Sequence, residues 1–279
     1  VHCSFHVTFL LVALTPIHSF AFVGLVRPNV ISRQYGSFST SEFNAFREKR
    51  IRLSNNKFPL RTASVPPEFA AVSQETIRLA KLLKARPFFE VGVVGGSTCT
   101  QAFSDKRHLS DADLDALRVV SLHDDYDDDG TPFSARRKVV EILRAKEDEI
   151  VAGARSVVLE RFVGITGPGG GLYPASRSEA CWRDFCTFLQ CVCYATAADV
   201  PRFTNAEGAA LMRQLYTELH VPLDAMVVGV TALRDLSRQR VCAAAEAAGE
   251  AAEERTGLGR GWKVAEGAFD HLIAVLEQF

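Results

Sequence analysis

The chain has 279 residues, of which 47% are hydrophobic, and this is enough for one sizeable buried core with appendages. Its formal net charge of −1 gives no overall attraction to nucleic acid or to an anionic membrane surface, so we expect neither as a partner. No apolar run reaches the roughly 20 residues that a membrane-spanning helix needs, so we predict a protein that does not span a membrane.

The first 62 residues have the composition of targeting signals. The apolar stretch Phe5 to Ala13 has the length of a signal-peptide core, so residues 1–21 are interpreted as a signal peptide. Residues 22–62 are rich in Ser, Asn and Arg and contain only two acidic residues, Glu42 and Glu48, which is typical of a transit peptide. The alternative interpretation is an amino-terminal tail that carries no address.

Residues 63–97 are predicted to be an amino-terminal extension outside the main domain, and the sequence assigns no function to them. A helical pattern runs from Glu68 to Lys84 and ends at Arg86-Pro87, because proline cannot continue a helix. Phe88 to Thr98 is then consistent with a short strand or an extended linker. Its glycines lack the G-x-G-x-x-G spacing and no alternating strand and helix pattern follows, which argues against a nucleotide-binding loop.

An acidic segment, His123 to Gly130, contains five aspartates among eight residues. Asp125, Asp127 and Asp129 match the first half of a calcium loop, but the twelfth position is Arg136, where a bidentate glutamate is needed. We therefore predict a solvated acidic loop between two helices and no metal site.

Every other element of the carboxyl-terminal two thirds has helical periodicity, which predicts an all-α fold. The chain turns at a glycine-rich segment that begins at Gly167, and a new helix starts after Pro174 with Ser176 or Ser178 as its cap. Gly257 to Gly261 is expected to break the last helical region. The predicted helices lie from Ser110 to Val120, as two segments between Ser134 and Phe162, from Pro174 to Asp199, from Asn205 to His220, from Pro222 past Cys242, and from Trp262 to Phe279.

The clearest chemical signal is in the central helix, where Cys181 and Asp184 lie one turn apart on the same face. A helix start favours the thiolate, and a neighbouring carboxylate accepts hydrogen bonds, so this pair suits a covalently held ligand that is rich in N–H groups. Local chemistry alone also allows a structural cysteine. The spacing of the other cysteines is not that of a zinc site, and we interpret them as packing residues: Cys99, Cys186, Cys191, Cys193 and Cys242.

Two further classes of protein are disfavoured. The sequence has no Ser/His/Asp or paired-carboxylate arrangement with a supporting context, so we do not expect an enzyme. A haem protein needs an axial ligand, and neither His220, at a helix end, nor His271 is placed to provide one.

The run Cys181-Trp182-Arg183-Asp184, with Leu189 and Tyr194 after it and Pro168-Gly169-Gly170 before it, resembles the bilin-attachment helix of the phycobiliprotein family, most closely that of allophycocyanin α subunits. The resemblance continues in the same order from roughly Cys99 to Phe279, and it implies a globin-like domain at residues 98–279 that begins with a helical extension. The further segments that carry it are Leu109-Ser110 with Leu114-Asp115, Ala197-Ala198-Asp199, Leu219-His220-Val221-Pro222-Leu223 and Glu266-Gly267-Ala268-Phe269-Asp270.

The resemblance implies a role for five residues. Cys181 would form a thioether to ring A of a phycocyanobilin-like open-chain tetrapyrrole, Asp184 would accept hydrogen bonds from its pyrrole N–H groups, and Arg183 would pair with a propionate. Tyr173 and Tyr194 would pack beside the pigment. The implied function is light harvesting and excitation energy transfer in photosynthesis, and the alternative is a pigment-free structural or assembly protein of the same fold.

The implied partners are a phycobiliprotein β subunit or a second copy of this chain, a bilin lyase, and thylakoid-associated photosystem or linker proteins. Several positions depart from the family pattern: Thr187 and Phe188 replace a tyrosine pair, Gln190 replaces an arginine, and Phe103 and His108 replace an interface aspartate and tyrosine. The last three changes remove polar contacts to a β subunit, so the choice of partner stays open.

The implied location is a plastid. Ser19-Phe20-Ala21-Phe22 resembles the phenylalanine-containing cleavage motif of proteins sent to plastids of secondary red-algal origin. Together with the phycobiliprotein resemblance, this motif predicts a protein associated with the thylakoid.

Overall fold

The computed structural model describes residues 73–92, 96–121, 133–247 and 252–279. The predicted signal peptide, transit segment and acidic loop lie outside these residues. The described residues all belong to one compact unit.

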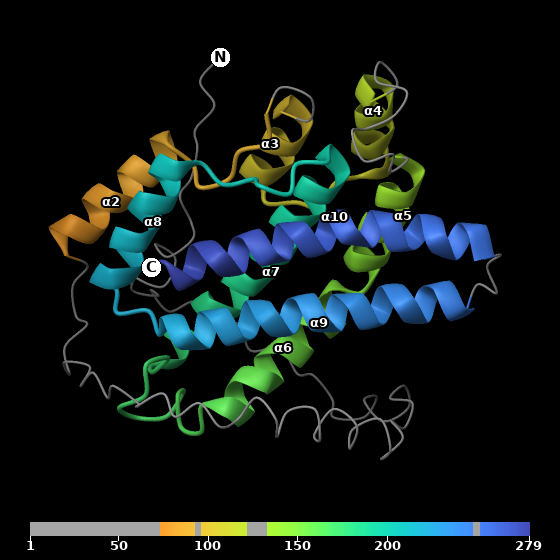
Figure 1. The fold of residues 1–279 in the computed structure, drawn as a ribbon. Coiled ribbons are helices and arrows are strands. Elements are labelled where there is room, and N and C mark those ends of the chain that lie inside the picture. Colours follow the sequence, from red (N-terminus) through yellow and green to blue (C-terminus); the bar gives the residue numbers. More distant parts are fainter. Residues whose placement is uncertain (1–72, 93–95, 122–132, 248–251) are drawn as a thin grey trace, which may run out of the picture. The chain divides into compact units, whose positions relative to one another are not determined.

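All regular elements in the described part of the chain are helices, which confirms the all-α prediction (Figure 1). Phe89 and Thr204 form an isolated antiparallel bridge outside the helices. No described helix is long and apolar enough to span a bilayer. The helices are α2 (Gln74–Ala85), α3 (Gly96–Asp105), α4 (Asp111–Ser121), α5 (Phe133–Ala145), α6 (Glu147–Arg161), α7 (Ala175–Ala198), α8 (Ala206–Glu218), α9 (Leu223–Ala247) and α10 (Ala252–Glu277).

Helix α7 is the centre of this unit. It contacts α3, α4, α5, α6, α9 and α10, and every residue from Cys191 to Ala198 is buried, so its second half is surrounded on all sides. Helices α9 and α10 are the longest, and they lie side by side in opposite directions (Figure 1). The site described below is therefore carried by a helix that its neighbours hold firmly.

The starts of several predicted helices are confirmed by their caps. The Ser110 hydroxyl accepts a hydrogen bond from the Asp113 N–H at 3.2 Å and begins α4. The Asn205 side chain accepts from the N–H groups of Glu207 and Gly208 at 3.0 Å each and begins α8.

The cap predicted for α7 is wrong. The helix begins after Pro174 without a side-chain cap, and Ser178 donates its hydroxyl to the Ala175 carbonyl inside the first turns. At the other end Asp199 adopts a left-handed conformation with φ of 55°, and its N–H bonds to the carbonyls of Ala195 and Thr196. Its carboxylate forms an ion pair of 3.0 Å with the buried Arg136 of α5.

The predicted break at Gly257 to Gly261 is also wrong, because α10 continues through all three glycines. The reason is a close approach between helices. A Cβ atom on Gly261 would lie 2.6 Å from the carbonyl oxygen of Ala135 in α5, which is too near for any other residue. At this position glycine allows packing and does not end the helix.

Residues 73–92 are part of the same packed unit as the helices that follow them. The helix predicted from Glu68 begins at Gln74, capped by Ser73, and α2 packs along α8. A Cβ atom on Gly208 of α8 would lie 2.4 Å from the Pro87 carbonyl oxygen, so the two segments touch through their backbones. Phe88, Phe89 and Val91 are buried in the main core.

Candidate functional site

The structure brings Cys181 and Asp184 together between three helices. The Cys181 sulfur lies 3.3 Å from the Met226 sulfur of α9, and the residue is only 5% exposed. One turn along α7, Asp184 is 3% exposed, and its Oδ2 atom accepts a hydrogen bond of 3.0 Å from the Tyr216 hydroxyl of α8. The predicted pair is therefore a buried one.

Asp184 has an unused hydrogen-bond acceptor. Its Oδ1 atom is buried and has no hydrogen-bond partner in the structure, although buried polar atoms almost always have one. Burial raises the pKa of this carboxyl to about 7, and the Tyr216 hydrogen bond and the Arg183 charge only partly oppose the rise. A ligand that donates N–H groups would satisfy this atom, so the residues present fit the implied pigment in their chemistry.

The prediction that the helix start favours a thiolate at Cys181 is wrong. Burial raises the pKa of this thiol well above its usual range, the Asp184 carboxylate acts in the same direction, and the Arg177 charge opposes both. Cys181 lies in the second turn of α7, so desolvation outweighs the helix dipole, whose effect falls off within the first turn. The thiol is neutral in the closed structure.

The glycine turn, residues 162–174, leads from α6 into the helix that carries Cys181. The turn is confirmed: Gly169 has a φ of 84°, and a Cβ atom on Gly170 would meet the Ile165 carbonyl oxygen at 2.2 Å. The turn packs against the start of α9, as shown by Gly171, whose Cβ atom would lie 3.3 Å from Pro222. The glycine turn therefore lies against the start of α9, the helix whose Met226 contacts the Cys181 sulfur.

The remaining predicted site residues do not gather around Cys181. Arg183 is exposed, with no ion pair among the described residues, and Tyr173 is 45% exposed in the glycine turn. Tyr194 lies about 20 Å farther along α7 at 1.5 Å per residue. It is buried against Phe89 and donates its hydroxyl to the Arg107 carbonyl.

Sequence reasoning missed three residues of this site: Arg177, Tyr216 and Met226. Tyr216 lies in the helix predicted from Asn205 to His220. A buried tyrosine hydroxyl normally has a hydrogen-bond partner, and this is the signal that could have pointed to Asp184. Nothing in the sequence indicates that Met226 faces Cys181, since the two residues are 45 positions apart.

The three positions that depart from the family's subunit-interface pattern are used within the chain. Phe103 stacks on Phe89 with ring centroids 5.0 Å apart. His108 and Gln190 both contact the carboxylate of Glu147 at the start of α6, and the Gln190 bond is 3.2 Å long. These side chains join the amino-terminal helices to the core.

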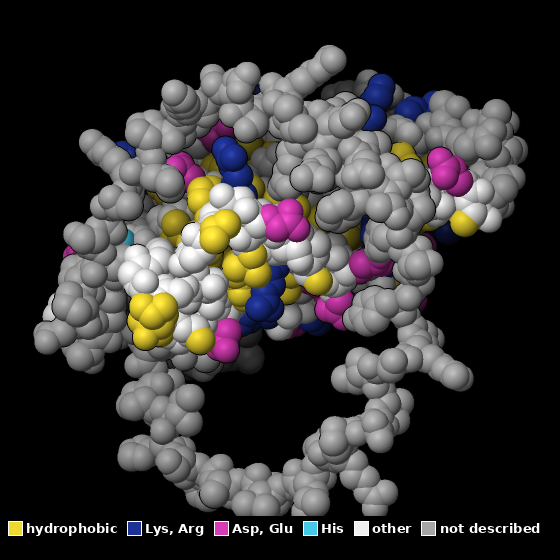
Figure 2. Space-filling model, turned by 90° about the horizontal axis from the view of Figure 1, so that it is seen from below, with side chains coloured by type: hydrophobic (Ala, Val, Ile, Leu, Met, Phe, Trp, Pro, Cys, Tyr) yellow, Lys and Arg dark blue, Asp and Glu magenta, His cyan; other side chains and the backbone are white. Residues whose placement is uncertain are grey.

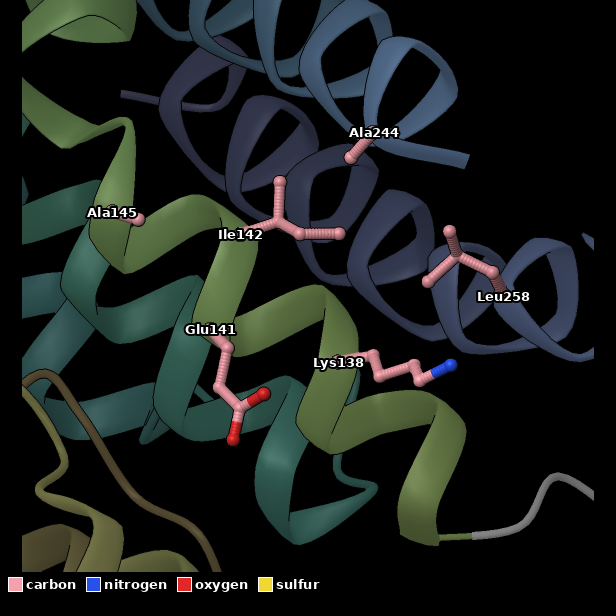
Figure 3. A pocket seen from close by; sticks show the side chains of 6 residues that line it. All are labelled: Lys138, Glu141, Ile142, Ala145, Ala244 and Leu258. Atoms are coloured by element: carbon pink, nitrogen blue, oxygen red, sulfur yellow. The ribbon is translucent and has the colours of Figure 1, made fainter. Parts of the chain in front are cut away.

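A shallow cavity of about 340 Å³ lies elsewhere, between α5 and the facing ends of α9 and α10 (Figure 3). No residue of α7 lines it, so it is not the predicted site. Its lining residues are Lys138, Glu141, Ile142, Ala145, Ala244 and Leu258. Within the described residues no group of His, Cys, Asp and Glu side chains could hold a metal ion.

Comparison with known proteins agrees with the resemblance read from the motifs. Allophycocyanin alpha chain 2 of Microchaete diplosiphon is 27% identical over 49% of this chain and 79% of its own length. The allophycocyanin alpha-B chain of Cyanidium caldarium is 28% identical over 50% and 79%. Allophycocyanin subunit beta-18 of a Nostoc strain is 31% identical over 43% and 69%.

Among solved structures, a far-red fluorescent biliprotein derived from an allophycocyanin F subunit of Chroococcidiopsis thermalis matches 48% of this chain and 98% of its own, with 20% identity and a TM-score of 0.39. The family model for the phycobilisome protein matches residues 99–276, which is well over half of the sequence. The chain belongs to the phycobilisome protein family.

Proposed function

We propose that this protein is a light-harvesting phycobiliprotein in which Cys181 and Asp184 hold an open-chain tetrapyrrole that takes part in excitation energy transfer. Allophycocyanins, which are among the proteins that this chain resembles, carry covalently bound bilins and are not enzymes. The observation that supports the assignment to these two residues is the buried, unpartnered Oδ1 atom of Asp184 one turn from a thiol.

The attachment chemistry is an addition. The Cys181 sulfur would bond to one carbon of a side-chain double bond on ring A, and the thiol hydrogen would go to the other carbon, so no atom leaves and no external oxidant or reductant is needed. A bilin so attached supplies visible absorption. The chain's task is to hold it extended and rigid, which limits the loss of excitation through torsional motion.

Asp184 would be the main polar contact to the pigment. Its Oδ1 atom accepts N–H groups, and Tyr216 keeps the Oδ2 atom occupied and the carboxylate in place. An ionised acceptor makes a stronger hydrogen bond than a neutral one. The exposed Arg183 is available to a propionate, and Tyr173 lies in the turn that precedes the attachment helix.

A second candidate function is that of a pigment-free structural or assembly protein of the same family. The closed state of the site favours it, because Cys181 and Asp184 are both almost fully buried and the glycine turn packs against α9. The two candidates differ in one observable property, which is covalent pigment on Cys181.

Location and partners follow the family. Phycobilisome proteins are associated with photosynthetic thylakoid membranes, and we propose a plastid of secondary red-algal type, with residues 1–21 and 22–62 as the leader. Proteins of this family form α and β assemblies. We propose a phycobiliprotein β subunit or a second copy as the assembly partner, a lyase for pigment attachment, and photosystem or linker proteins as neighbours.

The decisive experiment is co-expression with bilin synthesis and lyases, followed by zinc fluorescence of a denaturing gel. Wild-type chain should fluoresce and Cys181→Ala should not. Cys242→Ala is the matched control, since that cysteine is exposed and lies on another helix, and it should fluoresce like wild type. Fluorescence that survives Cys181→Ala would refute the assignment, and none in the wild type would favour the pigment-free function.

A further inference from the structure

The glycine turn is a compact segment that is stabilised by hydrogen bonds within its own backbone. Between Phe162 and Tyr173 several backbone hydrogen bonds join residues of the turn to one another, and the longest-range one runs from the Leu172 N–H to the Ile165 carbonyl at 2.8 Å. Ile165 and Leu172 are buried in the main core, whereas Val163 is 90% exposed and Tyr173 45%. Hydrophobic side chains are visible on the face seen from below, on which this turn lies (Figure 2). Of these side chains, Ile165 and Leu172 attach the glycine turn to the core.

Arg177, at the start of α7, joins the glycine turn to the end of α8 by hydrogen bonds. Its Nε atom donates to the Gly171 carbonyl at 3.2 Å, and one terminal nitrogen donates to the carbonyls of Leu219 and His220 at 2.9 and 3.0 Å. One planar side chain therefore joins the glycine turn to the carboxyl-terminal end of α8. These two segments are far apart in the sequence.

The contacts of Arg177 lie next to Cys181 along α7 and next to Met226 along α9. Arg177 is one turn before Cys181 on the same face of α7, and the two are close enough for each to influence the charge of the other. On the facing helix, Gly171 rests on Pro222, which is one turn before Met226, the residue that touches the Cys181 sulfur. The contacts that Arg177 and Gly171 make therefore lie one helical turn from the contact between Cys181 and Met226, on α7 and on α9.

We propose that Arg177 is a latch that keeps the glycine turn shut over Cys181 and so controls when this thiol can react. The purpose of the latch rests on the proposed attachment at Cys181, because a bulky pigment must reach a sulfur that is now buried. In the shut state the thiol is neutral and its nucleophilic form is disfavoured. Opening the turn admits water, which favours the thiolate, and provides space in the same movement.

The latch is suited to reversible opening. The hydrogen bonds from Arg177 to Gly171, Leu219 and His220 go to backbone carbonyls, which water can solvate once the turn lifts. Lysine cannot reproduce the contact, because a single ammonium group lacks the planar fork that reaches the turn and α8 together.

The test measures alkylation rates of the individual cysteines by iodoacetamide in the pigment-free, native chain, with mass spectrometry as the readout. In Arg177→Gln the rate at Cys181 should rise at least tenfold. Cys99 and Cys191, which are fully buried in the core, should stay protected, and the exposed Cys242 gives the intrinsic rate. Arg155→Gln is the matched control, because the Arg155 guanidinium lies 5.3 Å from the centre of the Trp182 ring and so contacts α7 elsewhere.

An unchanged rate at Cys181 in a folded Arg177→Gln variant overturns the latch. If that variant also exposes Cys191, it has unfolded, and Arg177→Lys, which keeps the charge and the aliphatic stem, takes its place. A rise confined to Cys181 then supports the latch, and equal rises at Cys181 and Cys191 overturn it. Because no pigment is used, a chain that never binds bilin still answers the question, and a failed latch leaves the attachment proposal standing.

Discussion

Tyr216 donates its hydroxyl to one carboxylate oxygen of Asp184 at 3.0 Å, and the other oxygen of Asp184 is buried without a partner. The Asp184 carboxyl belongs to α7, and the hydrogen bond from Tyr216 of α8 fixes its orientation. Two measurable consequences follow, one for a bound pigment and one for the stability of the chain without it.

With pigment attached, Asp184→Asn should keep the thioether and change the visible band. Asparagine is close to aspartate in shape, so Cys181 stays where it is, but the acceptor for the pyrrole N–H groups becomes neutral and the hydrogen bonds weaken. Absorption of the purified protein and zinc fluorescence of a gel measure the two properties separately. Asp148→Asn, an exposed residue on α6, is the control and should leave the spectrum as it was. An unaltered band in Asp184→Asn would place the pigment's N–H groups elsewhere.

Without pigment, stability should fall as pH rises from about 4 to about 7. The pKa of Asp184 is raised from 3.8 to about 7 in the folded chain, so the folded state binds a proton that the unfolded state has already released. The protonated Asp184 carboxyl contributes its full stabilisation of the folded state below the unfolded pKa. This stabilisation is lost as pH rises through the folded pKa, and it amounts to about 4 kcal/mol at most.

The measurement is the free energy of unfolding in urea at pH 5 and pH 8, for wild type and Asp184→Asn. All other titrating groups are common to both chains, so the wild type should lose more stability between the two values than the variant does. Equal losses would show that the Asp184 carboxyl ionises in the folded chain near its ordinary pKa.

The helical fold could be predicted because most helices combine a clear period with a clear start. Ser110 and Asn205 are caps that act as their residue types suggest. The site could be predicted only in part. The positions of Cys181 and Asp184 on one face follow from their spacing, but their burial depends on Met226 and Tyr216, which reach them from other helices. Tertiary packing decided the state of the thiol, and the sequence carries no local sign of it.

Glycines in α10 give a third prediction. Gly261→Ala should lower the free energy of unfolding by about 1 to 3 kcal/mol, because its Cβ atom would lie 2.6 Å from the Ala135 carbonyl oxygen and α10 would have to move away from α5. Gly259→Ala is the matched control on the same helix. Nothing lies within 4 Å of its Cβ position, so alanine should raise stability by up to about 1 kcal/mol through its better helix propensity. Urea unfolding of both variants measures this, and a gain at both positions would contradict the close approach.

The same glycines explain why the helix break was expected at the wrong place. A glycine lowers helix propensity wherever it occurs, and the sequence alone cannot distinguish a helix end from a contact between two backbones. Gly208 behaves like Gly261, since it admits the Pro87 carbonyl against α8. That contact also explains why residues 73–92 are packed into the core although their sequence carries no family motif.

A buried ion pair gives the last prediction. Arg136 is 1% exposed and pairs with Asp199 at 3.0 Å, so removing the negative charge leaves a buried cation without this counter-charge. Asp199→Asn isolates that effect, because asparagine also accepts the left-handed conformation that residue 199 adopts. The variant should lose about 3 kcal/mol of stability at neutral pH. Asp270→Asn is the control: its partner Arg234 is reached at 2.8 Å on the surface, where an ion pair contributes about 1 kcal/mol or less. Urea unfolding decides between them, and a similar loss for both would mean that the Arg136 charge does not depend on Asp199.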